Sequence, residues 1–156
     1  MSKVITFSRN FPAYHPRKGE PTYFVEKLYA SLGYDVLDEE RNFNPRLSLD
    51  RFRPKHHTIR GGKRWKVGDK FSPRIWSDKP YRSKQQIIAP DITIKKIWDI
   101  ETDINGVFIL NGFYFDVTGG FFSENDGLMA DDLLNWFPMG KIFKGQVICW
   151  NEHTNY

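Results

Sequence analysis

Hydrophobic and polar positions alternate over many short stretches of the chain, and this period-two pattern predicts β-strands. β-Branched and aromatic residues are enriched in these stretches, as is typical of strands. The predicted strands cover Lys3–Phe7, His57–Arg60, Lys70–Trp76, Gln86–Ala89, Ile92–Ile100, Val107–Leu110, Phe113–Val117 and Lys144–Trp150. Between two of them, Asn111-Gly112 favours a tight type I′ hairpin, because both residues tolerate the positive φ that this turn needs.

Two other stretches show the spacing of amphipathic helices. Apolar residues from Phe24 to Leu32 recur at helical spacing, which predicts a helix over residues 21–32 with Gly33 as its terminator. A second helix is predicted over residues 128–137. Many short strands, few helices and no βαβ alternation together predict an α+β fold, a mixed β-barrel flanked by about two helices.

The length of 156 residues suits a single domain spanning residues 1–156, because two cores would each be marginal at this size. Hydrophobic residues make up 40% of the chain, which is enough to fill one compact core. The stretch from Tyr34 to Pro54 is polar, contains two prolines and shows no sustained period. We therefore expect a surface insertion at residues 34–54.

No apolar window approaches the roughly 20 residues of a membrane span, and the N-terminus lacks the apolar region of a secretory signal. The sequence therefore predicts a cytoplasmic protein with no membrane contact. Its single cysteine, Cys149, lies in an apolar stretch and is expected to be an inert core thiol. The histidines lack metal-ligand spacing and no nucleotide-cofactor motif occurs, so neither a metal nor a cofactor is expected.

Positive charge is concentrated in one part of the chain. The net charge is only +4, yet residues 51–84 contain 12 Lys or Arg against 2 acids. Such polarisation is the electrostatic footprint of a phosphate-bearing partner. We therefore expect a basic cleft around Lys55–Lys70, where Gly61-Gly62 would let the backbone approach an anion closely.

Aromatic residues are interleaved with these cations, as in proteins that stack the bases of single-stranded nucleic acid. Trp65 and Tyr81 are expected to be exposed because each lies among charges or turn residues, whereas Phe71 and Trp76 are assigned to the core. The expected partner is RNA, another single-stranded nucleic acid or a modified nucleoside. The predicted anion- and nucleic-acid-binding residues are Arg53, His57, Arg60, Lys63, Arg64, Trp65, Lys66, Tyr81, Arg82 and Lys84.

Several short motifs, taken together and in this order, resemble the ASCH family. They are Lys55-x-x-Thr58-Ile59-Arg60, Val67-Gly68-Asp69, Ser123-Glu124-Asn125-Asp126-Gly127 before an acidic helix, and a closing strand through Gln146-Val147-Ile148. The resemblance covers about residues 51–150. It implies a β-barrel of the PUA-like superfold and, as is thought for most members of the family, RNA binding.

The threonine in the first motif resembles a subset of small ASCH amidohydrolases, which remove the acetyl group from N4-acetylcytidine with a lysine, a threonine and a glutamate. In this chain the pattern falls on Lys55, Thr58 and Glu124. Arg53 stands where the family's signature has a glycine, and the insertion before residue 51 is a second departure. Both departures would alter the mouth of the pocket.

Amide hydrolysis needs a nucleophile, a base to take its proton and an acid to protonate the departing amine. If Lys55 lies on the loop before the strand, partial desolvation would lower its pKa and let it deprotonate Thr58 or a water, with Glu124 as the proton donor. Each residue also has a simpler role, as a phosphate-facing cation, a β-branched strand residue and a helix-end acid. Three functions therefore stay open: an RNA- or nucleotide-binding domain, an amidohydrolase, and a protein-interaction module that uses the basic patch.

Overall fold

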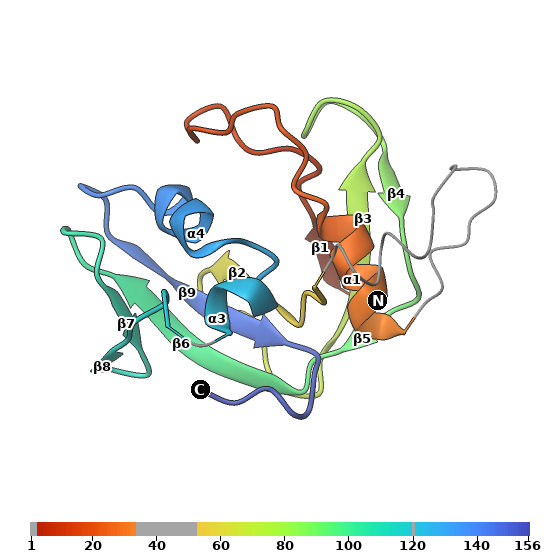
Figure 1. Ribbon diagram of the computed structural model, residues 1–156. Coiled ribbons are helices and arrows are strands. Elements are labelled where there is room, and N and C mark those ends of the chain that lie inside the picture. Colours follow the sequence, from red (N-terminus) through yellow and green to blue (C-terminus); the bar gives the residue numbers. More distant parts are fainter. Residues whose placement is uncertain (1–2, 34–52, 120) are drawn as a thin grey trace.

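Strands in the computed structural model form two sheets, and helices lie against them (Figure 1). The structure describes residues 3–33, 53–119 and 121–156. The strands are β1 (Lys3–Thr6), β2 (His57–Gly61), β3 (Lys70–Trp76), β4 (Gln85–Ile87), β5 (Ile92–Thr93), β6 (Lys96–Thr102), β7 (Phe108–Leu110), β8 (Phe113–Tyr114) and β9 (Phe143–Cys149). The helices are α1 (Phe24–Leu32), α3 (Phe122–Asn125) and α4 (Ala130–Trp136).

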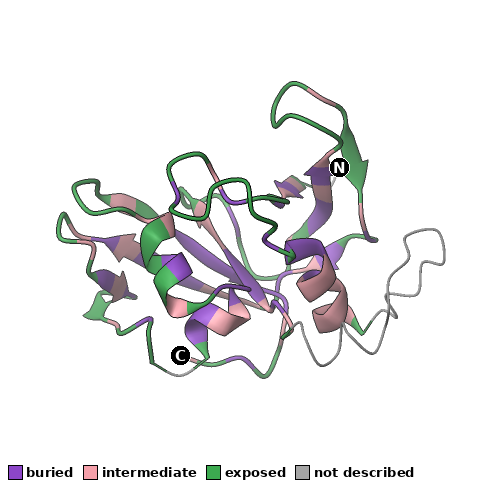
Figure 2. Cartoon of the chain, turned by 45° about the horizontal axis from the view of Figure 1, so that its top comes forward, coloured by how far each residue is buried: buried purple, intermediate pink, exposed green. Residues whose placement is uncertain are grey.

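The first sheet has β3 at its centre. β1 runs parallel to it, with Lys3 opposite Phe71 and Thr6 opposite Arg74, while β4 and β5 pair with β3 in antiparallel fashion. The turn between β3 and β4, residues 77–84, is exposed at nearly every position and extends from the body of the molecule (Figure 2). We call this turn the arm.

The second sheet has the order β2-β9-β6-β7-β8 and is antiparallel throughout. Strand β9, which lies between β2 and β6, is buried over its last five residues. Gly145 of β9 lies opposite Gly61, and a Cβ atom at Gly145 would come within 2.1 Å of Arg60 O. Glycine at position 145 of β9 therefore lets the backbone of β2 approach closely at Arg60.

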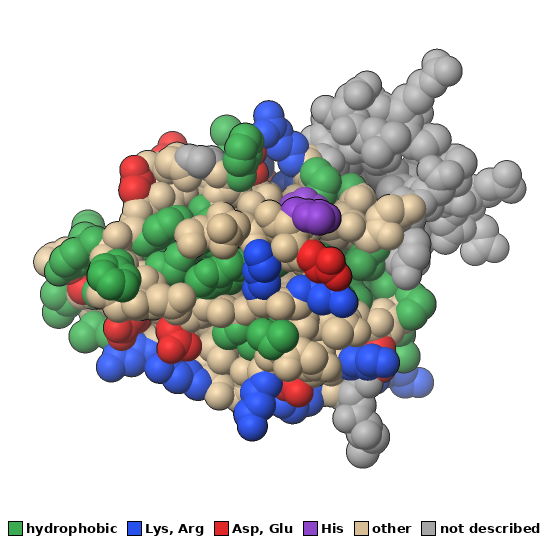
Figure 3. Space-filling view, turned by 90° about the horizontal axis from the view of Figure 1, so that it is seen from below, with side chains coloured by type: hydrophobic (Ala, Val, Ile, Leu, Met, Phe, Trp, Pro, Cys, Tyr) green, Lys and Arg blue, Asp and Glu red, His purple; other side chains and the backbone are tan. Residues whose placement is uncertain are grey.

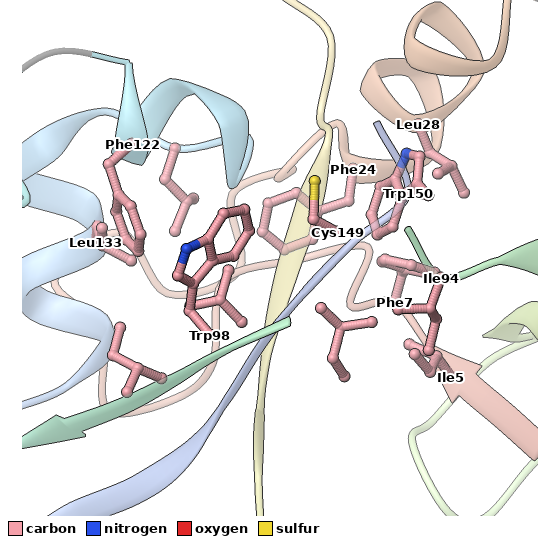
Figure 4. Close-up of a cluster of buried hydrophobic side chains, with 14 of the residues drawn as sticks. Ile5, Phe7, Phe24, Leu28, Ile94, Trp98, Phe122, Leu133, Cys149 and Trp150 are labelled. Atoms are coloured by element: carbon pink, nitrogen blue, oxygen red, sulfur yellow. The ribbon is translucent and has the colours of Figure 1, made fainter. Parts of the chain in front are cut away.

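Apolar side chains from both sheets and from the helices pack into one buried cluster (Figure 4). Ile5, Phe7, Leu28, Leu133 and Val147 each expose 2% or less of their surface. Burying one such side chain contributes roughly 1.5–3 kcal/mol. The cluster joins the two sheets. The loop that leads into β2 contacts elements from distant parts of the sequence, because the amide of Lys55 donates to Lys27 O and the amide of His56 donates to Asn125 O.

Most of the predicted strands are present, and β3 has the bounds that the sequence predicts. The predicted hairpin is confirmed, since Asn111 has a φ of 49° and Gly112 a φ of 86° between β7 and β8. The strand predicted over Phe113–Val117 is shorter than expected, because β8 pairs with β7 at two residues only.

The single strand predicted over Ile92–Ile100 is wrong. The chain forms β5 and β6 there, and these strands belong to different sheets. Their partners change at the junction, where the amide of Ile94 donates to Asp69 O and the amide of Lys95 donates to Cys149 O. Apolar residues recur in both halves, so the hydrophobic pattern alone does not show the break.

Both predicted helices are present but begin later than predicted. At α1, the Thr22 hydroxyl accepts a hydrogen bond from the amide of Phe24, and Tyr23 has a non-helical φ of 59°. Gly33 ends the helix in the left-handed conformation, as predicted. Most of the predicted insertion at residues 34–54 lies outside the described residues; only its last two positions are described, and they lie in the irregular segment before β2.

The predicted α+β class is confirmed, since helices and a mixed set of strands are both present. One short helix, α3, was not among the predicted elements. In the described part of the chain the strands form two separate sheets rather than one ring of paired strands. The barrel therefore stays a prediction.

Candidate functional site

Two groups of charged side chains lie along β2, one at each end. Lys55 enters from the loop before the strand, where its amide donates to Lys27 O of α1 at 3.0 Å. Arg60 lies near the other end, where its guanidinium reaches Thr6 of β1. The two groups differ in how their charge is balanced.

The Lys55 side chain is almost fully buried, with 1% of its surface exposed. Its Nζ lies 4.4 Å from the centroid of the Phe24 ring and donates a hydrogen bond to Asp126 O. The same Nζ is 3.4 Å from Asp126 Oδ1, so the two charges form a buried ion pair. Burial lowers the pKa of Lys55 to about 8, although Asp126 acts in the opposite direction.

Asp126 stays ionised at neutral pH because of its neighbours. Burial disfavours its charged form, but the Lys55 ammonium and the contact with His57 together hold its pKa below the usual value. Gly127 follows with a φ of 88°, and a side chain there would come within 3.3 Å of both Phe24 and Lys55. The turn therefore needs glycine to bring the carboxylate against the lysine.

His57 lies beside the same carboxylate. Its Nδ1 is 3.3 Å from Asp126 Oδ1, and its ring packs against Phe122 and Tyr156 at centroid distances of 4.9 and 5.5 Å. Burial lowers the pKa of the imidazole, so the ring is neutral at pH 7. His57 exposes 0% of its surface, so it cannot make the predicted contact with a bound anion.

Glu124, the acid that the sequence predicts for the site, is not in the ion pair with Lys55. Its Oε2 accepts a hydrogen bond from Arg53 Nη1 at 2.6 Å, so the predicted anion contact at Arg53 is occupied by a carboxylate of the same chain. Asp126, two residues further on, lies beside the lysine. Thr58, the predicted nucleophile, is buried on β2 with 5% of its surface exposed. The only sequence signal for the correct acid is the glycine that follows it.

Arg60 also enters the interior, but without a carboxylate partner among the described residues. Its Nη2 donates to Thr6 O at 2.5 Å, its guanidinium lies 5.6 Å from the centroid of the Phe7 ring, and its buried Nε has no described hydrogen-bond partner. Burial lowers the pKa of Arg60, although the Asp126 carboxylate acts in the opposite direction, and Tyr81 and Arg64 are close enough to influence it as well. Arg60 is therefore a buried cation close to the arm, with no ion pair to a described carboxylate.

The arm presents an aromatic ring near this arginine. Tyr81 exposes 86% of its surface, which confirms the predicted exposure, and its ring centroid lies 5.2 Å from that of Trp76. Trp76 is half-buried rather than fully in the core. The φ of Tyr81 is 63°, a left-handed conformation that a tyrosine rarely adopts. The residues that we call the arm site are Arg60, Arg64, Trp76, Tyr81 and Arg82.

Trp65, which the sequence predicts to be exposed, is buried at 3%. The Gln146 side chain holds its backbone on both sides, accepting from Trp65 N and donating to Trp65 O, each at 3.1 Å. Lys3 and Arg64 lie over the indole at 5.2 and 4.9 Å from its centroid. The neighbouring charges therefore shield this ring instead of marking a stacking surface. Phe71 is in the core, as predicted, with 0% exposed.

The remaining predicted cations lie on the surface. Lys63 lies 3.4 Å from Asp99, so its charge is partly balanced. Several exposed cations of the basic segment form no ion pair with a described carboxylate; they are Arg64, Lys66, Lys70, Lys79, Arg82 and Lys84. The unpaired positive charge is therefore on the surface around β3 and the arm, away from the Lys55 pair.

Other chemistry is limited. Cys149 is buried, and burial raises the pKa of its thiol, which makes it a poor nucleophile. Within residues 3–33, 53–119 and 121–156, no group of three or more His, Cys, Asp and Glu side chains could hold a metal ion. No helix in the described ranges is long and apolar enough to cross a membrane.

Comparison with known proteins found no matching family model, no similar curated protein and no similar solved structure. Function is therefore inferred from two arrangements of residues in this chain, the buried Lys55–Asp126 pair and the arm site.

Proposed function

We propose that the protein binds single-stranded RNA, or a nucleotide with the same chemistry, through the arm site. The observation that carries this proposal is the Tyr81 ring, 86% exposed and held at a φ of 63°. Such a backbone conformation costs of order 1–3 kcal/mol and persists only where the surrounding structure enforces it, which is most often at binding sites.

A tyrosine backed by a second ring offers a stacking platform for a base. Trp76 supports the Tyr81 ring from β3, with 5.2 Å between the centroids. Stacking on an aromatic side chain contributes roughly 1–3 kcal/mol per base and tolerates every base, because each has a π face. We therefore expect binding with weak sequence preference.

The charges around Tyr81 suit a sugar-phosphate backbone. Arg64 and Arg82 are exposed and form no ion pair with a described carboxylate. Guanidinium groups bind phosphate oxygens through two parallel hydrogen bonds, so they fix a phosphate in one orientation. Stacking and phosphate contacts would then act on neighbouring parts of one nucleotide.

The experiment is a titration of a fluorescently labelled single-stranded RNA 12-mer, followed by anisotropy at several salt concentrations. Tyr81→Ala should weaken binding by about tenfold, as expected for the loss of one stacked base. Tyr114→Ala is the matched control, because Tyr114 is also exposed, at 78%, but lies on β8. Equal effects of the two substitutions, or no salt-dependent RNA binding, would overturn the proposal.

The resemblance to the ASCH family and its PUA-like barrel is part of this proposal. It is supported by the order of elements, since the Lys-x-x-Thr-Ile-Arg motif leads into β2 and the Asp126-Gly127 turn comes before α4. The closing strand through Gln146 is β9, which pairs with β2. An experimental structure with the strands of both sheets joined into one closed ring would support the barrel.

A second candidate, amide hydrolysis, is favoured by the Lys55–Asp126 pair. A lysine whose pKa is lowered to about 8 by burial is partly neutral near that pH and can accept a proton. In such a reaction Lys55 would take the proton of the Thr58 hydroxyl as its oxygen attacks the amide carbonyl, and the protonated lysine, stabilised by Asp126, would pass that proton to the departing amine. The acetyl group would then be an ester on Thr58, and a water that loses its proton to Lys55 would hydrolyse this ester to acetate and restore the Thr58 hydroxyl.

Acetate release from N4-acetylcytidine tests this candidate. We expect a rate that rises with pH up to about 8, as Lys55 loses its proton. Thr58→Val and Asp126→Asn should each abolish it, with folding checked by circular dichroism. If the folded wild-type protein releases no acetate above the buffer rate, amide hydrolysis is wrong as a function. That result would not bear on the proposed RNA binding at the arm site.

A further inference from the structure

A hollow of about 710 Å³ lies between the C-terminal segment, residues 151–156, and the segment that contains β8 and α3. It does not include the arm site or the Lys55 pair. A space-filling view from below shows hydrophobic side chains gathered over the left half of this face, with charged groups mostly along the edge and over the right half (Figure 3). The hollow is in the size range of small-ligand sites, roughly 300–1,000 Å³.

Aromatic rings form its walls. Phe115, Phe122 and Tyr156 contact one another, and the planes of Phe115–Phe122 and Phe115–Tyr156 meet at 64° and 69°. Phe121 exposes 66% of its surface at the rim. Phe122 is almost fully buried, so the rings that a ligand could reach are Phe115, Phe121 and Tyr156.

The charge in the hollow is negative. Asp116 lies on its wall, and hydrogen bonds from the hydroxyl and the amide of Thr118 lower the pKa of its carboxyl, so the group is ionised. Among the described residues, no Lys or Arg lines the hollow. The pKa of His56 is lowered by burial and by His57, so this wall residue is neutral at pH 7.

The polar groups of the wall are mainly amides, together with a second histidine, His153. Asn125 Nδ2 donates to the Tyr156 hydroxyl at 2.9 Å, which leaves the amide oxygen of Asn125 without a described donor. Asn151 lies 3.2 Å from His56 through its amide nitrogen. A phosphate would therefore find no Lys or Arg here, while a cation with an apolar surface would find rings, a carboxylate and the amide oxygen of Asn125.

We propose that this hollow binds an alkylated ammonium group, a class of cation that aromatic faces and a nearby carboxylate recognise together. The group could belong to a small quaternary ammonium compound or to a methylated lysine of a peptide, since both present the same cation. This site is independent of RNA binding at the arm site and has the opposite charge preference.

The test compares choline with 3,3-dimethylbutan-1-ol, which has nearly the same shape but no charge. Binding is followed by the NMR shifts of the wall residues in the full chain. We expect choline to bind at least tenfold more tightly than the neutral alcohol. Equal affinity would overturn the proposal by showing an apolar hollow only, and so would the absence of shifts at the wall residues.

Two variants locate the site. Phe121→Ala and Asp116→Asn should each weaken choline binding by about fivefold. Phe113→Ala and Asp131→Asn are matched controls, because both residues are exposed and neither lines the hollow. Controls that weaken binding as much as the two wall variants would overturn the assignment.

A third comparison identifies the source of the cation. A peptide that carries trimethyl-lysine should bind more tightly than choline if the natural ligand is a protein, and no more tightly if it is a small molecule. Either result supports the ammonium site. Unmethylated lysine peptide that binds as well as the trimethylated one would contradict it, because its ammonium is strongly hydrated and lacks the apolar surface.

Discussion

The two ends of β2 use cations in opposite ways. Lys55 is buried against Asp126, so its charge is balanced inside the protein and does not face solvent. Arg60, Arg64 and Arg82 have no ion pair with a described carboxylate. A count of Lys and Arg over residues 51–84 treats these residues alike. After folding, however, only an exposed cation that forms no ion pair with a carboxylate can contribute its charge to a ligand. We therefore expect stability to depend on the Lys55 end of β2 and the proposed RNA binding to depend on the Arg60 end.

The largest effect should come from breaking the buried pair. Lys55→Met keeps the length and apolar contacts of the side chain but leaves Asp126 buried without its cation. Removing one partner of a buried ion pair typically costs about 3–5 kcal/mol. We expect a loss of this size in the free energy of unfolding, measured with urea. Lys66→Met, at an exposed position, should change it by less than about 0.5 kcal/mol.

This contrast also has an outcome that would contradict it. If Lys55→Met were as stable as Lys66→Met, the Lys55 ammonium would have to be solvated, and the difference between the two ends of β2 would disappear. The variant Lys55→Met/Asp126→Leu provides the control, since it removes both charges. It should recover a large part of the loss, because no unpaired charge then stays buried.

The sequence predicts much of the fold because burial imposes a local pattern. The β7–β8 hairpin follows from Asn111-Gly112, and β3 follows from the alternation over Lys70–Trp76. The break between β5 and β6 could not be predicted, because it depends on which strand pairs with each half. Strand partners are distant in sequence, so the local pattern of the stretch does not show where they change.

The candidate site was predicted less well, for a related reason. Lys55 and Tyr81 were identified, one as a desolvated lysine and one as an exposed ring, because local context determines both. Asp126 was missed in favour of Glu124, since only the turn at Gly127 decides which of two nearby acids meets a lysine 71 residues away. Trp65 was wrongly assigned to the surface because the Gln146 contacts that bury it come from β9.

Lys55 should also make stability depend on pH. Burial lowers its pKa to about 8 in the folded protein, against 10.5 for an ordinary lysine. Between these values the unfolded chain binds more protons than the folded one, so the free energy of unfolding rises with pH. From pH 7.5 to 9.5 the contribution of Lys55 should rise by about 2 kcal/mol. It is measured as the difference between wild-type and Lys55→Met urea curves, in which the other titrating groups cancel. A constant difference would mean that Lys55 titrates as an exposed lysine does.

Two glycines, Gly127 beside the buried Lys55–Asp126 pair and Gly62 just after β2, allow a smaller test of the difference between the two ends of β2. Gly127 and Gly62 both have positive φ, 88° and 80°, so alanine is strained at either position by about 1 kcal/mol. At Gly127 the new Cβ would also crowd Phe24 and Lys55, whereas at Gly62 nothing lies within 4 Å. We expect Gly127→Ala to cost about 1 kcal/mol more than Gly62→Ala in urea unfolding. Equal costs would mean that the packing around the buried pair relaxes freely.

The smallest effect should come from one cation of the arm site. Arg82→Ala removes a single phosphate contact, so RNA affinity should fall only a few-fold at physiological salt. The slope of log affinity against log salt should become shallower by about 0.7, the value for one neutralised phosphate on a single strand. Lys141→Ala is the matched control, since Lys141 is an exposed cation between α4 and β9. If both variants change the slope equally, the RNA senses only the net charge of the protein. If only Arg82→Ala changes the slope, the RNA contacts the cations of the arm site specifically. The free energy of unfolding of this variant should stay unchanged, because no buried carboxylate pairs with Arg82.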